Sequence, residues 1–445
     1  MSQPHPKKAR GRSRPWIVPP GLLVQGEPFE GFGVLDENRD ELGLLLWQSL
    51  RDVEVWAMAP AHQRNDLFST GALRQRMERI HEEVAPGTPV RPVLEGLANL
   101  LDRPSRVTPL EVCDLCEELS RWASDAGLPR TALAFSVRAA MAAPDEAAPA
   151  YLVGLISRRA ADYRRAEVWF RRALAIARHT GDWRVYSLAH AGLGQMHMQR
   201  GDGPRARSRL LRALRAARRH GIWSVRSTAL HDLFCIHATG TDARLAEQYA
   251  RAAFRSYGRQ HPRLPVLAHD IARFWMMHGY HALALPTFQA VLPHLVRPVE
   301  RMLGLSSLAQ SAAGAGDAEL FARTWNEVWR MIDERDDGEC VAEALINLAQ
   351  GAELLGQVVR LDMAASYALT VATRRGEAQE KVVAEALLRR SRDFGKEPAE
   401  PPPPGEDEGV EGVEGDELED DESTLVGSDL LAEELVEALT EVPVR

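Results

Sequence analysis

The sequence predicts an all-α protein, built as a superhelix of antiparallel helical hairpins with disordered ends. Three observations predict this fold class. The chain of 445 residues is 45% hydrophobic but only 6% aromatic, and its middle is rich in Ala and Leu, a mixture that favours helices over strands. The same residue types return at a fixed spacing of 40 residues. Apolar side chains recur three and four residues apart along most of the chain, as they do on one face of a helix.

The N-terminal quarter predicts a disordered segment followed by a small helical cap. Residues 1–28 are rich in Pro and Gly and carry five basic side chains, so we expect them to be disordered. Within 29–107, helices are expected at about 40–59, 70–84 and 91–101, because each stretch places its Leu, Met, Ile and Val residues on one face. These helices show no repeat register, which predicts a cap rather than part of the array.

A repeat array is predicted over residues 108–394. Its first helix has a clear start, because Thr108, Pro109 and Glu111 stand where a capping box places its N-cap, its N1 proline and its N3 acid. Self-similarity at a period of 20–50 residues is typical of solenoids. The residues that return after 40 positions are Gly154 and Gly194; Ala166, Ala206 and Ala246; Ala173, Ala213 and Ala253; Trp183 and Trp223; and Val185 and Val225. Small residues at such positions let two crossing helices approach closely.

At these residues the sequence resembles the tetratricopeptide repeat family. The family has small residues at its eighth, twentieth and twenty-seventh positions and a large one at its twenty-fourth. The matching residues are Gly154, Ala166, Ala173 and Phe170 in one unit, and Gly194, Ala206, Ala213 and Leu210 in the next. The units here are longer than usual and are similar to variants in bacterial regulators and adaptor proteins. The resemblance implies a right-handed superhelix of six or seven hairpins.

The resemblance also implies where a partner binds. In the family, the first helix of each hairpin lines the concave face, where side chains contact peptides. Carried over by register, the groove residues are Tyr151, Arg158, Gln195, Met198, His231, Cys235, His269, Arg273, Met276, Gln310 and Gln350. This mixture of polar and soft apolar groups suits an amphipathic helix or peptide. The alternative is that several of these side chains only pack against neighbouring helices. The predicted function is a protein-binding scaffold or adaptor.

No pattern in the sequence predicts catalysis, a metal or a cofactor. Cys113 and Cys116 form a single C-x-x-C inside a predicted helix, and a structural zinc site needs a second ligand pair. Buried core thiols are therefore the favoured interpretation. The sequence has no nucleotide-binding or hydrolase motif, so we expect a protein that is not an enzyme. A regulatory sensor of a signalling or transcription pathway is the alternative function, although no DNA-binding or nucleotide-binding domain is evident.

A band of arginines raises nucleic-acid binding as a further alternative. Residues 151–226 contain 17 Arg and four acids. Six of these arginines recur seven apart on the predicted second helices, whose exposed side is convex: Arg164, Arg171, Arg178, Arg205, Arg212 and Arg219. Clustered positive charge is typical of nucleic-acid binding. The band lacks a recognised reading motif, however, and the chain as a whole has a net charge of −9, so a solvated surface is favoured.

The C-terminal part predicts a tethered helix. The predicted linker, 395–427, is Pro-rich and acidic, and residues 396–445 contain 18 acids and two bases. In the last segment, 428–445, Ser428 and Asp429 can cap an amphipathic helix. The residues on its apolar face are Leu431, Leu435, Leu439 and Val442. We expect this helix to dock on a partner or back on the array, so that the tail regulates binding, with the acidic linker drawn to the Arg band.

Cysteine content and hydropathy predict a cytoplasmic location. Four cysteines are too few for a disulfide framework in a chain of this length. No signal peptide is evident at the N-terminus, and no apolar run reaches the roughly 18 residues needed to span a bilayer. We therefore expect no membrane partner. From the groove and the C-terminal helix described above, we expect a protein or peptide partner, with the chain's own tail as a candidate intramolecular one.

Overall fold

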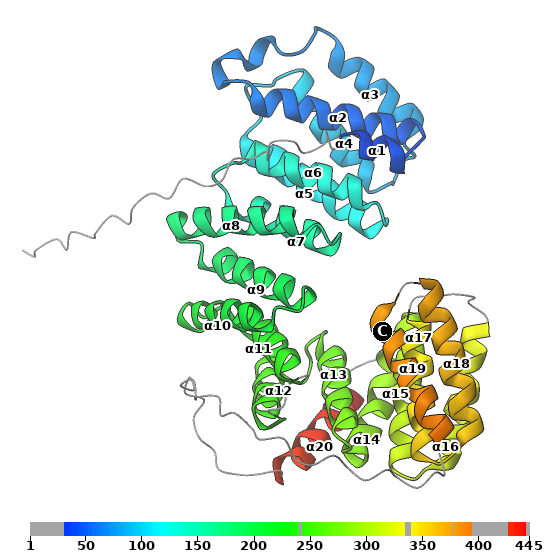
Figure 1. Cartoon of the computed structure of the whole chain (residues 1–445). Helices are drawn as coiled ribbons and strands as arrows, with labels where there is room; N and C mark the ends of the chain where they lie inside the picture. Colours follow the sequence, from blue (N-terminus) through cyan, green and yellow to red (C-terminus); the bar gives the residue numbers. More distant parts are fainter. Residues whose placement is uncertain are drawn as a thin grey trace, which may run out of the picture. The chain divides into compact units, whose positions relative to one another are not determined.

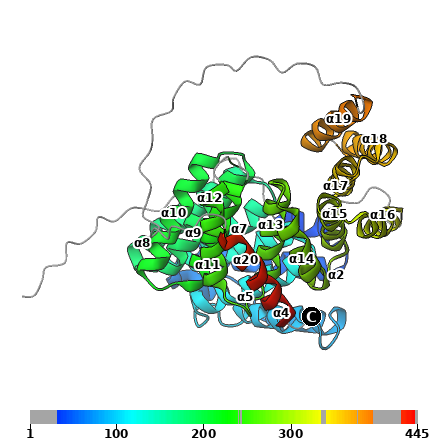
Figure 2. The ribbon, with the colours of Figure 1, turned by 90° about the horizontal axis from the view of Figure 1, so that it is seen from below.

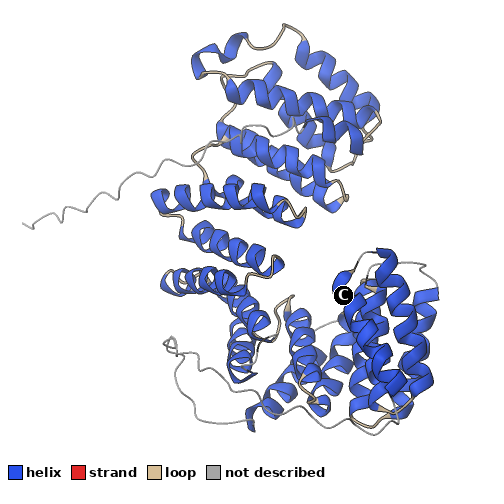
Figure 3. Ribbon diagram, viewed as in Figure 1, coloured by secondary structure: helices blue, strands red, loops and turns tan. Residues whose placement is uncertain are grey.

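The computed structural model describes residues 31–238, 240, 243–333, 340–375, 377–393 and 426–441. Over these residues the chain is a succession of helices joined by turns, without a strand (Figures 1 and 3), which confirms the predicted all-α class. It divides into two compact units, residues 1–236 and 237–445. Each unit is described by itself. The predicted disordered segment, 1–28, lies outside the described residues.

The N-terminal region of the first unit contains the three expected helices and one more. Its helices are α1 (Gly31–Glu37), α2 (Glu41–Met58), α3 (Ala72–Glu83) and α4 (Val90–Ala98), with a 3-10 turn at Asn99–Leu101. They enclose a core around Leu46, Leu50 and Trp56, which are fully buried. The Trp56 Nε1 donates a 2.6 Å hydrogen bond to the Pro104 carbonyl, so this core also anchors the loop that leads to the array.

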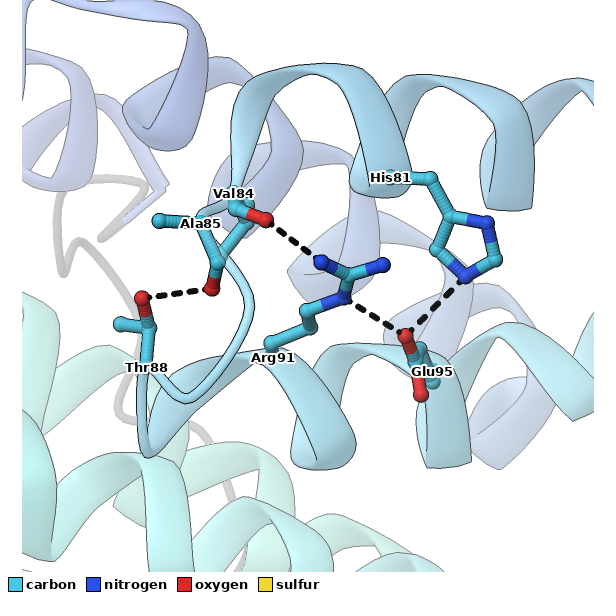
Figure 4. Close-up of polar contacts among 6 residues, drawn as sticks. All are labelled: His81, Val84, Ala85, Thr88, Arg91 and Glu95. Carbon is cyan, nitrogen blue, oxygen red and sulfur yellow. Dashed lines mark hydrogen bonds and ion pairs between the residues drawn. The ribbon is translucent and has the colours of Figure 1, made fainter.

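Polar contacts hold the turn between α3 and α4 (Figure 4). The Arg91 guanidinium donates to the Val84 carbonyl at 3.0 Å, which satisfies a backbone acceptor at the end of α3. Its Nε donates to Glu95 at 3.0 Å, and the same carboxylate lies 3.2 Å from His81 Nε2. Within the turn, the Thr88 hydroxyl donates to a backbone carbonyl at 2.8 Å. These contacts fix α3 and α4 as an antiparallel pair.

Helix α1 was not predicted, and it joins the cap to the first repeat. The carboxylate of Glu37, at its last residue, accepts hydrogen bonds from the backbone N–H groups of Arg130 and Thr131, both at 2.8 Å. It also accepts one from the Thr131 hydroxyl at 2.8 Å. These N–H groups begin α6 (Pro129–Ala142), where they lack partners within the helix. Glu37 therefore caps α6 from 94 residues away in sequence.

The array begins where the capping box predicts. In α5 (Pro109–Asp125), the Glu111 N–H donates to the Thr108 hydroxyl at 3.2 Å, and the Thr108 N–H donates to the Glu111 carboxylate at 2.7 Å. Helices α5 and α6 pack as one hairpin. The remaining helices of the first unit are α7 (Ala147–Arg159), α8 (Tyr163–Thr180), α9 (Trp183–Gln199), α10 (Gly203–Arg219) and α11 (Trp223–Ala238).

Repeated residues place the helices of these hairpins. Asp162, Asp182 and Asp202, 20 residues apart, cap α8, α9 and α10, each accepting from the N–H three residues on. At the crossing of α7 and α8, a Cβ on Gly154 would lie 2.7 Å from the Phe170 ring. A Cβ on Gly194 would lie 2.6 Å from Leu210 in the next hairpin. The predicted close crossings at Gly154 and Gly194 are confirmed.

The second unit continues with helical hairpins and ends with two further helices. The hairpins α13–α14, α15–α16 and α17–α18 pack in succession, and α19 covers the last of them. The core formed by α15 to α19 includes Phe321, Trp325, Leu345 and Leu361, all buried. The helices are α12 (Ala243–Tyr257), α13 (Leu264–Met277), α14 (His281–Val291), α15 (Pro298–Gly314), α16 (Ala318–Asp333), α17 (Val341–Leu354), α18 (Val358–Arg375), α19 (Ala378–Asp393) and α20 (Val426–Glu441).

Candidate protein-binding site

Hydrogen bonds between side chains connect the first helices of successive hairpins in the first unit. Arg158 on α7 donates from Nη1 to the Gln199 side-chain oxygen on α9 at 3.2 Å. Gln195, also on α9, donates from Nε2 to the Asp232 carboxylate on α11 at 2.8 Å. We call these four residues the polar ladder. Two of them, Arg158 and Gln195, are predicted groove residues, and the structure brings both into one row.

The other two ladder residues were missed, although the sequence carries a signal for them. Asp232 follows Gln195 by 37 residues and Gln199 follows Arg158 by 41, so each pair is separated by about one repeat. Polar residues one period apart on first helices face each other across the stack. Burial, followed by the charge of the neighbouring Arg159, lowers the pKa of the Arg158 guanidinium. The Asp232 carboxylate opposes this shift, because it favours the charged form of Arg158.

An aromatic and a methionine flank the ladder. The Tyr151 ring on α7 is half-buried, with its centroid 5.8 Å from that of Phe170, and burial raises the pKa of its hydroxyl. Met198 on α9 is half-buried, as is Cys235 on α11. His231 is only 3% exposed, and its ring stacks near Phe234. Tyr151 and Met198 are therefore more accessible from solvent than His231.

In the second unit, an ion pair connects first helices. Arg273 on α13 lies 2.8 Å from the Glu343 carboxylate on α17, and both side chains are about one-third exposed. His269, one turn before Arg273, has its Nδ1 3.5 Å from Asp270 and its ring edge against Phe288. The predicted residues His269 and Arg273 thus lie on one stretch of α13, in contact with other side chains of the unit.

The remaining predicted residues of the second unit divide by burial. Met276 is 5% exposed and Gln310 is 9% exposed, so both are largely covered by the array. The Gln310 side-chain oxygen is buried without a hydrogen-bond partner among the described residues. Gln350 is half-buried on α17. One turn before it, Asn347 donates to the hydroxyl of Ser306 at 3.0 Å, a buried contact between α15 and α17 that the sequence did not indicate.

The groove arginines do not form a carboxylate clamp. Arg158 donates to Gln199, and Arg273 pairs with Glu343, so each guanidinium contacts a protein group. A clamp for a chain-terminal carboxylate needs several converging donors.

The Arg band lies where it was expected. All six arginines are exposed on α8 and α10. Two of them have acidic partners on their own helix or its cap, since Arg171 lies 2.6 Å from Glu167 and Arg205 lies 3.2 Å from Asp202. The sequence did not distinguish these arginines from Arg172, which is buried and donates to the Pro144 carbonyl at 2.9 Å.

The C-x-x-C thiols belong to the core, as predicted. Cys113 and Cys116 lie on one side of α5 within the N-terminal cluster and are 4% and 0% exposed. Burial, with a smaller contribution from Glu117, raises the pKa of the Cys113 thiol to about 12. Burial also raises the pKa of Cys116. A raised thiol pKa suppresses the thiolate, which is the form that attacks disulfides and binds metals.

The C-terminal helix packs on the second unit. Helix α20 lies against α14 and, over fewer residues, against α13 (Figures 1 and 2). Leu431, Leu435 and Leu439 are buried, as their spacing predicted. The helix begins at Val426, so Ser428 and Asp429 lie inside it and the prediction that they cap it is wrong. Val442 and the acidic linker lie outside the described residues.

The comparisons with known proteins find matches among solved structures only. No family model and no curated protein matches the chain. BtubC from P. vanneervenii aligns at 17% identity and a TM-score of 0.41, over 50% of this chain and 93% of its own. A Rap protein complexed with competence and sporulation factor aligns at 11% identity and a TM-score of 0.34, over 79% of this chain and 98% of its own. The TPR2AB domain of yeast Sti1, in its pHSP90 complex, aligns at 13% identity and a TM-score of 0.24, over 63% of this chain and 98% of its own.

The successive helical hairpins of the chain themselves show the repeat architecture. The helix lengths also bear on membranes. Among the described residues, no helix combines the length and the apolar character needed to cross a bilayer.

Proposed function

We propose that this chain is a non-catalytic scaffold that binds a protein partner along the first helices of its hairpins. The polar ladder is the observation that carries the proposal. Through it, α7, α9 and α11 are joined by two side-chain hydrogen bonds. Such contacts hold neighbouring helices at a defined spacing, and a surface held in its binding geometry loses less entropy when a ligand binds.

The chemistry of this face favours an amphipathic helix or an extended peptide. Tyr151 and Met198 are half-buried, so each offers apolar surface that is already partly ordered. Methionine adapts its shape to different apolar ligands. The ladder residues offer a carboxylate, amides and a guanidinium, which can bind the polar edge of the same ligand. In the second unit, Arg273 and Glu343 supply a comparable charged pair.

The remaining groove residues have a supporting role in this proposal. His231, Met276 and Gln310 are buried, so they shape the first helices from within. Cys235 is half-buried in the first unit, and His269 and Gln350 are half-buried in the second, so each can add contact surface within its own unit. A regulatory sensor would use the same surface for a signalling ligand. Nucleic-acid binding would use the exposed Arg band on α8 and α10 instead, and the two surfaces can be tested separately.

Site-specific photocrosslinking tests the proposal. A photoreactive phenylalanine analogue replaces Met198 on the first-helix face or, as the matched control, the exposed Arg215 on α10. Each full-length variant is irradiated in lysate of the source organism, and the crosslinked species are identified by mass spectrometry. We expect one dominant protein adduct at position 198 and none at position 215. The partner is then purified and titrated against wild-type and M198E chains, and we expect about tenfold weaker binding for M198E.

Two outcomes would contradict the proposal. Equal protein adducts at both positions would mean that the first-helix face has no special role. Adducts at position 215 that disappear after nuclease treatment would assign binding to the Arg band and to nucleic acid. Raising the salt concentration separates these cases further, because phosphate contacts weaken steeply with salt.

A further inference from the structure

The surface of α13 and α14 holds α20 in one register. Three buried leucines at four-residue spacing, Leu431, Leu435 and Leu439, form the buried face of α20 together with Ala432 and Ala438. This periodicity places all five side chains on one stripe of the helix. Leu430 is 56% exposed on the opposite side, so burial is confined to the stripe.

Polar contacts on one flank complement the acidic character of α20. Arg259, in the loop before α13, lies 2.8 Å from Glu437 and 3.7 Å from Glu441. Glu434 adds a third favourable charge, and the hydrogen bond from Arg259 lowers the pKa of Glu437. Helix α20 contains five acidic residues and no basic one. One guanidinium thus faces three carboxylates along a single edge of the helix.

A histidine fixes the position of the helix along its axis. His294, in the 3-10 turn after α14, has its Nε2 3.0 Å from the Leu439 carbonyl. Leu439 lies in the last turn of α20, where carbonyls lack a partner within the helix. This contact ties the last turn of α20 to the turn that follows α14. The surface thus contacts an apolar stripe, an acidic flank and one backbone carbonyl in the last turn of α20.

The same contacts make the helix exchangeable. A helix of 16 residues is marginal on its own, so α20 owes its order to the surface beneath it. Its ion pairs are weak, because Arg259 is 42% exposed and Glu437 is 60% exposed. The segment is connected to α19 through 32 residues, 394–425. Covalent tethering raises its effective concentration and offsets weak intrinsic affinity.

We propose that the α13–α14 surface is a recognition site for acidic amphipathic helices, occupied by α20 of the same chain and available to a partner helix of the same pattern. The pattern consists of leucines four residues apart, with glutamates two residues after the second and third leucines. A partner that presents it competes with α20 for Arg259 and His294. The proposal rests on the α20 contacts and is independent of the polar ladder on α7, α9 and α11.

Peptide binding to the full-length chain tests the proposal. The probe is a fluorescein-labelled peptide of residues 426–441, and its anisotropy reports binding. L435D places a charge in the buried stripe and releases the tethered helix, whereas L430D makes the same change on the exposed side. We expect the L435D chain to bind the probe at least about tenfold more tightly than the wild type, because the tethered competitor is removed. The L430D chain should bind the probe with the same affinity as the wild type. Equal affinities for all three chains would overturn the proposal.

Charge reversal tests the register. In the L435D chain, R259E should weaken the probe about fivefold at low salt, and a probe carrying E437R and E441R should recover that loss. Circular dichroism verifies that adding R259E leaves the helix content of the L435D chain unchanged. If R259E changes neither probe's affinity, the assigned recognition of the acidic flank is wrong.

Hydrogen exchange identifies which copy supplies the helix. In the wild-type chain, protection of residues 426–441 should be independent of protein concentration, as expected for an intramolecular contact. Protection that falls on dilution would show that a second copy supplies α20, which overturns the intramolecular assignment. None of these measurements involves Met198, so their failure and the failure of the groove proposal are distinguishable.

Discussion

Gln195 and Asp232, 37 residues apart in sequence, meet at 2.8 Å and join the first helices of two successive hairpins. Helices of a solenoid are held chiefly by apolar contacts between neighbours. A polar contact on the first-helix face adds directionality, because an amide donor and a carboxylate acceptor satisfy each other only at one helix spacing. The ladder therefore defines the proposed binding face as well as the packing.

A charge change at Gln195 should destabilise the array at neutral pH. In Q195E, two carboxylates meet in place of a donor and an acceptor, which costs about 1 kcal/mol and raises the pKa of one of them. Because a raised carboxyl pKa favours the protonated form, this destabilisation should diminish as the pH falls from 7 to 4. Q199E is the matched control, since its carboxylate faces Arg158 and should be neutral or stabilising. Urea unfolding of the two variants at both pH values tests this, and equal effects at neutral pH would contradict it.

Removing the Glu37 carboxylate should destabilise the first repeat. E37A leaves the N–H groups of Arg130 and Thr131 without their acceptor, with an expected loss of about 1–2 kcal/mol. D36A is the control, because Asp36 forms an exposed ion pair with Arg130, and removing such a pair should change stability by less than about 0.5 kcal/mol. Thermal unfolding measures both. If the two variants lose the same stability, α1 does not cap α6.

His190 should make stability depend on pH in the acid range. Burial, followed by the positive charges of Arg209 and Arg212, lowers its pKa to about 4 from the ordinary value of 6.5. The unfolded chain therefore binds a proton that the folded chain excludes between these values. The stability from neutral His190 is complete above pH 6.5 and is lost as the pH falls toward 4, by on the order of 2–3 kcal/mol.

Replacing His190 should remove this part of the pH dependence. H190Q is compared with H62Q, since His62 is exposed in the N-terminal region. Chemical unfolding between pH 4 and 7.5 gives the free energy of unfolding as a function of pH. Its slope should be shallower for H190Q than for the wild type and unchanged for H62Q. Identical slopes for H190Q and the wild type would show that another group carries the effect.

The four cysteines should react in two classes. A pKa of about 12 leaves the Cys113 thiol largely protonated, with a thiolate fraction about a thousandfold below that of a thiol with a pKa of 9. Cys116 is fully buried beside it, whereas Cys235 and Cys340 are half-buried. Alkylation of the native chain at pH 7.5, followed by mass spectrometry, should label Cys235 and Cys340 first. Urea-unfolded protein, in which all four should react alike, is the control. Early labelling of Cys113 would contradict its place in the core.

Local sequence determined the helices and their order. The apolar periodicity located α2, α3 and α4 within a few residues, and Thr108 with Glu111 located the start of α5. Small residues 40 apart located the close crossings at Gly154 and Gly194. These features are predictable because periodicity, capping and steric size act between residues that are near in sequence or that repeat at one period.

Only the tertiary structure decided which side chains meet. Glu37 caps α6 through Thr131, which lies 94 residues later in the sequence, and Arg259 contacts Glu437, which lies 178 residues later. Burial likewise separated Arg172 from the exposed arginines beside it, and His231 from Tyr151 on the predicted groove. Sequence spacing assigns a residue to a face of its own helix, but its partner depends on which other helix covers that face. That choice is made by packing over the whole unit, and it determined where the C-terminal helix binds.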